Sequence, residues 1–130
     1  MNSIIAVFLL FFSACGSAEP AEPELIELGP VRITSQQAKE MIEEFDVIIL
    51  DVRTPEEFAG GHIENAVLIP VNELEYLIFD VIENKDQTLL IYCRSGNRSH
   101  HAAWTLADLG FTSVYDFGGI LTWEGVIVTP

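Results

Sequence analysis

Apolar positions along this chain alternate between the spacing of strands and the spacing of helices. Short runs rich in apolar residues predict strands at 47–50, 67–69, 88–92 and 113–116. Apolar residues three and four positions apart predict helices at 35–44, 72–82 and 99–109, with shorter helical segments at 55–59 and 120–124. Strands that alternate with helices predict an α/β fold, in which helices cover both faces of a central parallel sheet.

The stretch Tyr92-Cys93-Arg94-Ser95-Gly96-Asn97-Arg98-Ser99 joins the most apolar predicted strand to the predicted helix behind it. A cysteine in this position faces the unpaired N–H groups and the positive dipole end of a helix. Two arginines follow it within five residues. Both features favour the thiolate, which is the nucleophilic form of cysteine. An inert buried cysteine is the alternative, but it would not need arginines beside a dry core.

The same loop has the composition of an anion-binding nest. Gly96 can adopt backbone angles that a side chain forbids, so that successive N–H groups turn inward. Asn97 tolerates the left-handed region, and Ser99 is a good N-cap for the following helix. We therefore expect the main chain around Cys93 to stabilise negative charge.

Other polar residues are predicted at the same edge of the sheet, because sites in parallel sheets form at the carboxyl ends of strands. This edge is expected to hold Asp51, Cys93 and Asp116. Asp51 either orients the loop, by accepting N–H bonds or pairing with an arginine, or is a purely structural cap. Arg53 is expected to pair with Glu56 or Glu57 rather than to contact substrate.

Four motifs, in order, resemble those of the rhodanese family of sulfurtransferases. The first is the loop itself. The others are Asp51-Val52-Arg53 with Glu57-Phe58, then Gly61-His62-Ile63 with Ala66 and Ile69-Pro70, and finally Gly118-Gly119 with Trp123. The resemblance spans about residues 31–130 and implies a rhodanese-like sheet of about five strands.

The resemblance implies sulfur transfer through a persulfide on Cys93, which accepts the outer sulfur of thiosulfate or a similar donor. A thiol or cyanide would then remove that sulfur, so ping-pong kinetics are expected and no cofactor is implied. Asp51, Arg53 and Ser99 would support the loop. The expected substrate-binding residues are Arg94, Ser95, Gly96, Asn97 and Arg98.

Two other functions are weighed against this one. Relatives of rhodanese that act on phosphate or arsenate have five residues between cysteine and arginine, whereas four residues separate Cys93 from Arg98. The shorter loop favours a single sulfur atom over a tetrahedral oxyanion, so a phosphatase or arsenate reductase is disfavoured. The domain could also be a non-catalytic module that carries sulfur or docks a partner.

The histidines do not form a recognisable metal site. His100 and His101 are adjacent and point to different sides of a helix, while His62 is expected to bond nearby backbone. One cysteine and scattered histidines lack the spacing of metal ligands. His100 could serve as a base beside Cys93, although a loop-stabilised thiolate does not require one.

The charge balance narrows the range of partners. The 130 residues include 20 acidic and 6 basic side chains, which give a formal net charge of −14. Such a body is not expected to bind nucleic acid or anionic membrane surfaces. The length suits one domain with a core of its own.

The N-terminus predicts export. Ile4 to Phe12 form an uninterrupted apolar run of signal-peptide length, and Ser13-Ala14-Cys15 resembles the lipobox of bacterial lipoproteins. We expect a signal peptide at 1–14 and lipidation of Cys15, with an ordinary cleaved signal or an uncleaved anchor as alternatives. Residues 15–30 form an acidic, proline-containing tether. The rhodanese-like domain then covers 31–130, in the periplasm or cell envelope, and touches a membrane only through this N-terminus.

Overall fold

A computed structural model of the chain describes residues 29–130. The predicted signal peptide, Cys15 and most of the predicted tether lie outside these residues. Export and lipidation therefore stay predictions. Within 29–130, none of the helices has both the length and the apolar character needed to cross a bilayer.

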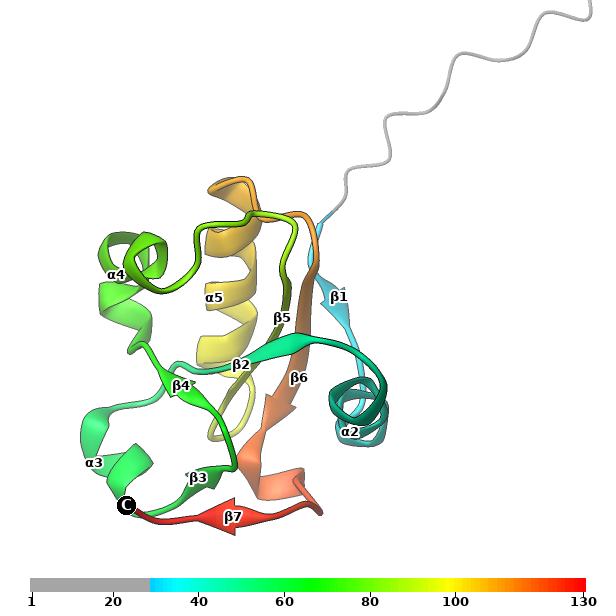
Figure 1. Ribbon diagram of the computed structural model, residues 1–130. Coiled ribbons are helices and arrows are strands. Elements are labelled where there is room, and N and C mark those ends of the chain that lie inside the picture. The colour runs from blue at the N-terminus through cyan, green and yellow to red at the C-terminus, as the bar shows by residue number, and fades with distance from the viewer. Residues whose placement is uncertain (1–28) are drawn as a thin grey trace, which may run out of the picture.

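A five-stranded, entirely parallel sheet forms the centre of the domain, in the order β1-β6-β5-β2-β4 (Figure 1). This confirms the predicted fold class. The middle three strands are the longest and most buried. The strand bounds are β1 Val31–Arg32, β2 Val47–Asp51, β4 Val67–Leu68, β5 Thr88–Cys93 and β6 Val114–Gly119.

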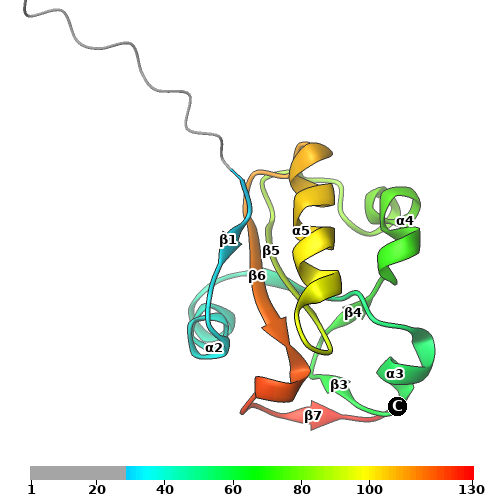
Figure 2. The same cartoon turned by 180° about the vertical axis from the view of Figure 1, so that it is seen from behind.

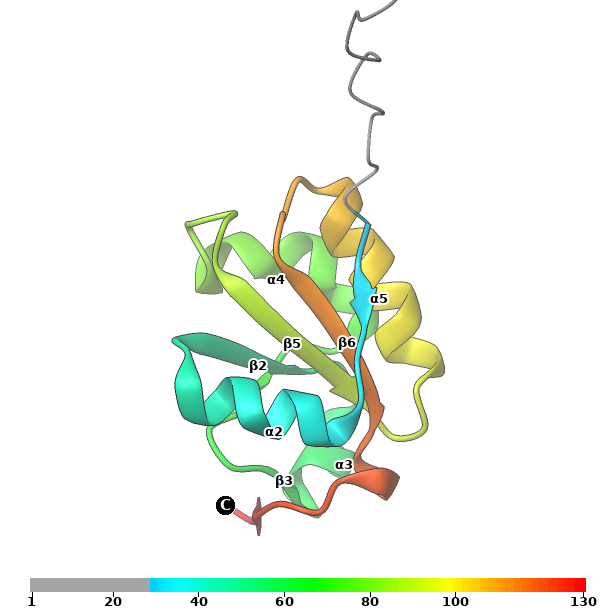
Figure 3. The same cartoon turned by 90° about the vertical axis from the view of Figure 1, so that its right-hand side faces the viewer.

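Helices cover both faces of this sheet. Helix α2 (Ser35–Glu44) lies on one face, and α4 (Leu74–Val81) and α5 (Asn97–Asp108) lie on the other (Figure 3). Helix α2 begins after Thr34, whose side chain and that of Gln37 form reciprocal capping hydrogen bonds. Viewed from behind, α5 runs along β5 and β6 (Figure 2).

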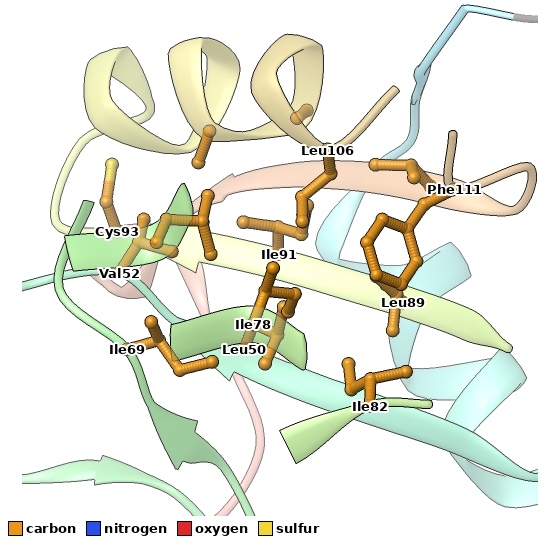
Figure 4. Packing of buried hydrophobic residues seen from close by; sticks show 14 residues of the cluster. Leu50, Val52, Ile69, Ile78, Ile82, Leu89, Ile91, Cys93, Leu106 and Phe111 are labelled. Atoms are coloured by element: carbon orange, nitrogen blue, oxygen red, sulfur yellow. The ribbon is translucent and has the colours of Figure 1, made fainter. Parts of the chain in front are cut away.

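The side chains of β5 alternate between two apolar clusters, as the period of a strand requires. Leu89, Ile91 and Cys93 pack into the cluster beneath α4 and α5, where they form a row (Figure 4). Leu90 and Tyr92 pack into the opposite cluster, beside Ala38 of α2. Each fully buried leucine or isoleucine contributes about 1.5–3 kcal/mol. Cys93 is therefore the last residue of a well-packed core row.

Several element boundaries differ from those expected. The helix predicted at 72–82 is divided into a 3-10 turn, η1 (Val71–Glu73), and α4. The last helical turn is the 3-10 turn η2 (Ile120–Thr122), and α3 covers Pro55–Ala59 as predicted. The predicted strand at 113–116 is β6, which continues to Gly119.

A small antiparallel pair was not predicted at all. Strands β3 (His62–Ile63) and β7 (Ile127–Val128) pair at the end of the domain that also carries α3 (Figure 1). Strands of two residues are too short for an alternating pattern to reveal them.

Candidate active site

The loop between β5 and α5 places Cys93 as the sequence predicts. Strand β5 ends at Cys93, and α5 begins at Asn97 after Gly96, whose φ is 114°. With this left-handed backbone, the Gly96 N–H donates a 3.0 Å hydrogen bond to the Cys93 Sγ. Gly96 thus uses the conformational freedom expected of it, and the sulfur lies against a main-chain donor.

Two glycines at the end of β6 allow the loop to lie close to the sheet. Gly118 has a φ of 88°, and Gly119 pairs with Cys93 across a bulge in the strand register. A Cβ added to Gly119 would overlap the carbonyl group of Arg94. Only glycine therefore fits beneath the loop at position 119.

Ser99 does not cap the helix, which corrects the sequence-based expectation. The helix begins two residues earlier, so Ser99 lies in its first turn and is fully buried. The Ser99 hydroxyl lies 3.1 Å from the carbonyl oxygens of Gly96 and Gly118, to either of which it donates. Ser99 therefore fastens the loop to β6. Asn97 is helical and does not use the left-handed region.

The surroundings of Cys93 lower the pKa of its thiol. Burial by itself raises that pKa, but the N–H and hydroxyl groups of Ser99, with the N–H groups of Gly96 and Ser95, outweigh burial. These donors stabilise the thiolate more than the thiol. Cys93 is buried, and it is the free cysteine of the described part of the chain. The predicted preference for thiolate thus has its main cause in the loop backbone.

Asp51 lies in a buried network, and the arginine that pairs with it is Arg53, not an arginine of the loop. The Asp51 carboxylate binds the guanidinium of Arg53 at 2.7 Å and accepts the hydroxyl of Tyr92 at 2.6 Å. Arg53 was expected to pair with Glu56 or Glu57, and this was wrong. Arg53 is buried, and the carboxylate that pairs with it there is that of Asp51, two residues before it.

The same network links the sheet to the segment after α3. Arg53 donates to the carbonyl oxygen of Gly61 at 2.8 Å, and the hydroxyl of Tyr92 accepts the N–H of Ile63 at 3.1 Å. Burial and the hydrogen bond to Asp51 raise the pKa of Tyr92, which therefore stays a donor. Sequence reasoning did not single out Tyr92, although a tyrosine in a buried strand needs a hydroxyl partner.

The two arginines of the loop have different surroundings. Arg98 makes a two-pronged ion pair with Glu57 of α3, with N···O distances of 2.7 and 3.0 Å. This pair lowers the pKa of Glu57 to about 2 and raises that of Arg98. Arg94 is exposed and forms no ion pair within residues 29–130. The loop therefore presents one free cation and one partly neutralised cation.

Asp116 lies inside β6 rather than at its end, which corrects the predicted position. It pairs with Ile91, two residues before Cys93, because β6 continues to Gly119. One Asp116 oxygen accepts the N–H of Gly118 at 2.9 Å, and the other lies 3.6 Å from the guanidinium of Arg32. Sequence reasoning missed Arg32, because nothing in the pattern places the first strand beside β6.

The three histidines have local or solvent-exposed surroundings. The Nδ1 atom of His62 is 3.0 Å from the carbonyl oxygen of Phe58, which confirms the expected local backbone bond. Its ring also stacks on that of Phe58. His100 and His101 are exposed on α5. Within the described range, no group of three or more potential metal-ligating side chains comes together.

Two hollows adjoin the loop, and Arg94 lines both. One, of about 510 Å³, lies between the start of α2 and the turn η2, and Ser95 also lines it. The other, of about 420 Å³, is an open groove beside α3, lined by Arg53 and Glu57 among others.

Comparison with known proteins identifies relatives that match most of the domain. The family model described as a rhodanese-like domain matches residues 34–125. Thiosulfate sulfurtransferase PspE of Escherichia coli is 34% identical over 71 residues, covering 55% of this chain and 68% of that protein. Thiosulfate sulfurtransferase GlpE of Pseudoalteromonas translucida is 31% identical over 93 residues, covering 71% and 87% respectively.

Solved structures have the same fold. A rhodanese-like domain protein from Staphylococcus aureus superposes with a TM-score of 0.68 at 34% identity, covering 77% of this chain and 98% of that one. An Escherichia coli rhodanese with anions superposes with a TM-score of 0.61 at 30% identity, covering 64% and 98%.

Proposed function

We propose that this chain, which belongs to the rhodanese-like domain family, is a sulfurtransferase that carries sulfur as a persulfide on Cys93. The observation that carries the proposal is the position of the Cys93 Sγ, 3.0 Å from the N–H of Gly96 in a loop that lowers the thiol pKa. The names of the relatives indicate thiosulfate as the donor class.

In the first half-reaction, the Cys93 thiolate attacks the outer sulfur of thiosulfate. A bond forms between Sγ and that sulfur, and the sulfur–sulfur bond of thiosulfate breaks. The electron pair leaves with sulfite, so thiolate and thiosulfate become a persulfide anion and sulfite without any external oxidant. The donor and acceptor are not on the enzyme together, so ping-pong kinetics follow.

The loop contributes to this step mainly by stabilising negative charge on the sulfur and by attracting the anionic donor. The N–H groups that stabilise the thiolate can also stabilise the persulfide, because both carry negative charge in the same place. Arg94 supplies a free cation for the anionic donor and for the departing sulfite. Arg98 contributes through the N–H groups that Glu57 leaves unused, so its attraction for the donor is the weaker of the two.

In the second half-reaction, a thiol or cyanide attacks the outer sulfur of the persulfide. The bond between the two sulfurs breaks, and its electron pair returns to Sγ. This regenerates the Cys93 thiolate. No cofactor is needed, since electrons move only between the sulfur atoms and the acceptor.

The proposal is tested by assaying thiocyanate formation from thiosulfate and cyanide. We expect turnover by the unaltered chain and none by Cys93→Ser, with both proteins folded by circular dichroism. Assaying p-nitrophenyl phosphate hydrolysis in parallel tests the phosphatase alternative. Phosphatase activity without thiocyanate would replace the proposed function, and neither activity would favour a docking module.

We also propose that the chain is exported and lipidated on Cys15, which would hold the domain at a membrane in the cell envelope. The intact mass of protein from native membranes tests this. Acyl mass on a chain that begins at Cys15 supports lipidation, whereas a chain that retains Met1 contradicts both export processing and lipidation.

A further inference from the structure

Arg32 lies against the turn that holds the Cys93 sulfur, although it comes from the first strand of the sheet. A Cβ added to Gly96 would lie 3.2 Å from the Arg32 Nη2 atom, and one added to Gly118 would lie 3.7 Å from it. Gly96 is also the residue whose N–H donates to the Cys93 Sγ at 3.0 Å. The guanidinium of Arg32 and the sulfur of Cys93 therefore adjoin the same residue of the loop.

The strand register places Arg32 on the same face of the sheet as the sulfur. Arg32 pairs with Asp116 of β6, and Asp116 pairs with Ile91 of β5. Side chains of residues paired in neighbouring parallel strands point to the same face. Ile91 and Cys93 both belong to the apolar cluster beneath α4 and α5 (Figure 4). Arg32 thus approaches the loop at the edge of the face to which the Cys93 side chain points.

A buried carboxylate holds this guanidinium in place. The Asp116 side chain is 3% exposed, and its Oδ2 atom lies 3.6 Å from the Arg32 Nη1 atom. That oxygen has no hydrogen bond within residues 29–130, while the other oxygen accepts the N–H of Gly118 at 2.9 Å. Burying a carboxylate without a cation is costly. Asp116 therefore favours the orientation of Arg32 in which the guanidinium lies over the loop.

The other arginines around the loop have partners or positions of a different kind. Arg53 and Arg98 form ion pairs with N···O distances of 2.7 Å, and Arg94 is exposed. The carboxylates of those two pairs belong to Asp51 and Glu57, and the histidine on the same stretch of α5 is the exposed His100. Arg32 differs from these arginines because it adjoins the turn from behind, next to a buried carboxylate that would otherwise repel a thiolate on the same face.

We propose that Arg32 is a positioning residue of the sulfur site, which stabilises the Cys93 thiolate and its persulfide by placing positive charge behind Gly96 and offsetting the buried Asp116. The persulfide half of this inference rests on the proposed function. The contacts through Gly96 put the guanidinium within about 10 Å of the sulfur, which is about the screening length at 0.1 M salt. The Arg32 side chain is 62% exposed, so its effect is modest and sensitive to salt.

The test measures the pH midpoint of Cys93 alkylation by iodoacetamide at about 10 mM salt, where charges are little screened. We expect Arg32→Gln to raise the midpoint by roughly 0.3–0.7 pH units, the effect of one charge at this range. Arg32→Lys keeps a cation and should keep most of the lowered midpoint. Lys85→Gln is the matched control, because it also removes one positive charge, but before the start of β5, at the end of that strand away from the loop. It should leave the midpoint nearly unchanged.

Two results would overturn the inference. One is a midpoint in Arg32→Gln equal to that of the unaltered chain. The other is an equal rise in Arg32→Gln and Arg32→Lys, which would assign the effect to the packing of the guanidinium instead of its charge. Circular dichroism verifies folding, because Arg32→Gln leaves Asp116 buried without its cation. If that variant unfolds, Asp116→Asn with and without Arg32→Gln provides the same comparison.

The rate of sulfur loading gives a second measurement of the same effect. At a pH below the midpoint, the rate at which thiosulfate places sulfur on Cys93 should fall about two- to fivefold in Arg32→Gln, in proportion to the lost thiolate. Equal loading rates in the two chains would contradict the inference. If the unaltered chain accepts no sulfur at all, the proposed function fails instead, and the alkylation midpoints still decide whether Arg32 stabilises the thiolate.

Discussion

A few hydrogen-bond donors that lie within one turn of the chain lower the pKa of Cys93. Burial of the thiol opposes ionisation, and the donors of Ser95, Gly96 and Ser99 overcome that opposition. The Ser99 hydroxyl has one proton, which it can donate either to the sulfur or to the carbonyl oxygen of Gly96 or Gly118. The chemistry of the loop thus depends more on its main chain and on Ser99 than on the arginines.

Ser99→Ala should raise the pKa of Cys93, because it removes a donor that stabilises the thiolate. A thiol with a lowered pKa reacts at lower pH, so the variant needs a higher pH to reach the same rate of alkylation. The rate with iodoacetamide, measured across pH, gives both midpoints, and the unfolded chain provides the reference. A midpoint in Ser99→Ala equal to that of the unaltered chain would show that the hydroxyl does not act on the sulfur.

At the scale of elements, two side-chain ties hold α3 and the segment after it to the rest of the domain, one to the central strands and one to α5. One is the buried network of Asp51, Arg53 and Tyr92, which reaches Gly61 and Ile63. The other is the ion pair of Glu57 with Arg98. Both ties join elements that line the groove beside the loop. They therefore position the residues of the candidate site as well as stabilise the fold.

Tyr92→Phe should destabilise the fold, because it leaves the N–H of Ile63 and one Asp51 oxygen without their shared partner. Buried groups that lose a hydrogen bond cost about 1–3 kcal/mol. Chemical denaturation measures the change. Tyr76→Phe is the matched control, since Tyr76 is 78% exposed and its loss of a hydroxyl should have almost no effect. Equal free energies of unfolding for the two variants would show that the hydrogen bonds of Tyr92 do not stabilise the fold.

The ion pair of Glu57 and Arg98 predicts a pH-dependent contribution to stability. The folded pKa of Glu57 is about 2, below that of a free glutamate, about 4.3. The contribution is therefore fully present above about pH 4.3 and is lost as the pH falls towards 2. The stability difference between the unaltered chain and Glu57→Gln should shrink between pH 5 and pH 3, as urea denaturation at about these pH values would show. A constant difference would mean that the carboxylate charge does not matter.

The sequence predicts the long helices and strands better than the short ones. The buried runs of β2 and β5 and the cap of α2 carry strong local signals, so their bounds are close to those expected. The positions that were missed depend on tertiary contacts instead. Ser99 looks like a cap, yet Gly96 already turns the chain. Arg53 is buried, and it pairs there with the buried Asp51 and not with the more exposed glutamates of α3.

In the candidate site, too, residues placed by local sequence could be predicted, and residues placed by tertiary contacts could not. Cys93 and Gly96 could be placed because their function depends on the local order of strand, loop and helix. Arg32 could not, because it comes to the loop from an edge strand of two residues. The pairing of Arg98 with Glu57 also joins positions 41 residues apart, which no local pattern reveals.

At the scale of the whole molecule, the excess of acidic residues opposes compactness. The net charge of −14 of the whole chain comes mostly from acidic residues of the domain, so like charges repel across its surface. Salt screens such repulsion beyond about 10 Å at about 0.1 M. Short-range pairs such as Asp51 with Arg53 are buried and much less screened.

Raising the concentration of sodium chloride should therefore raise the melting temperature of the domain. Calorimetry at about 20 mM and about 200 mM salt, spanning Debye lengths of roughly 20 to 7 Å, would measure the shift, which should be smaller when the acidic residues are protonated. A melting temperature that falls with salt at neutral pH would mean that favourable ion pairs, and not repulsion, dominate the surface.

The most direct measurement of the central claim is the intact mass of the protein after incubation with thiosulfate and removal of excess reagent. The account predicts that the unaltered chain gains the mass of one sulfur atom, that this mass is lost on adding cyanide, and that folded Cys93→Ser gains nothing. An unaltered chain without the added sulfur, or a Cys93→Ser variant that acquires it, would contradict the assignment of Cys93 as the sulfur carrier.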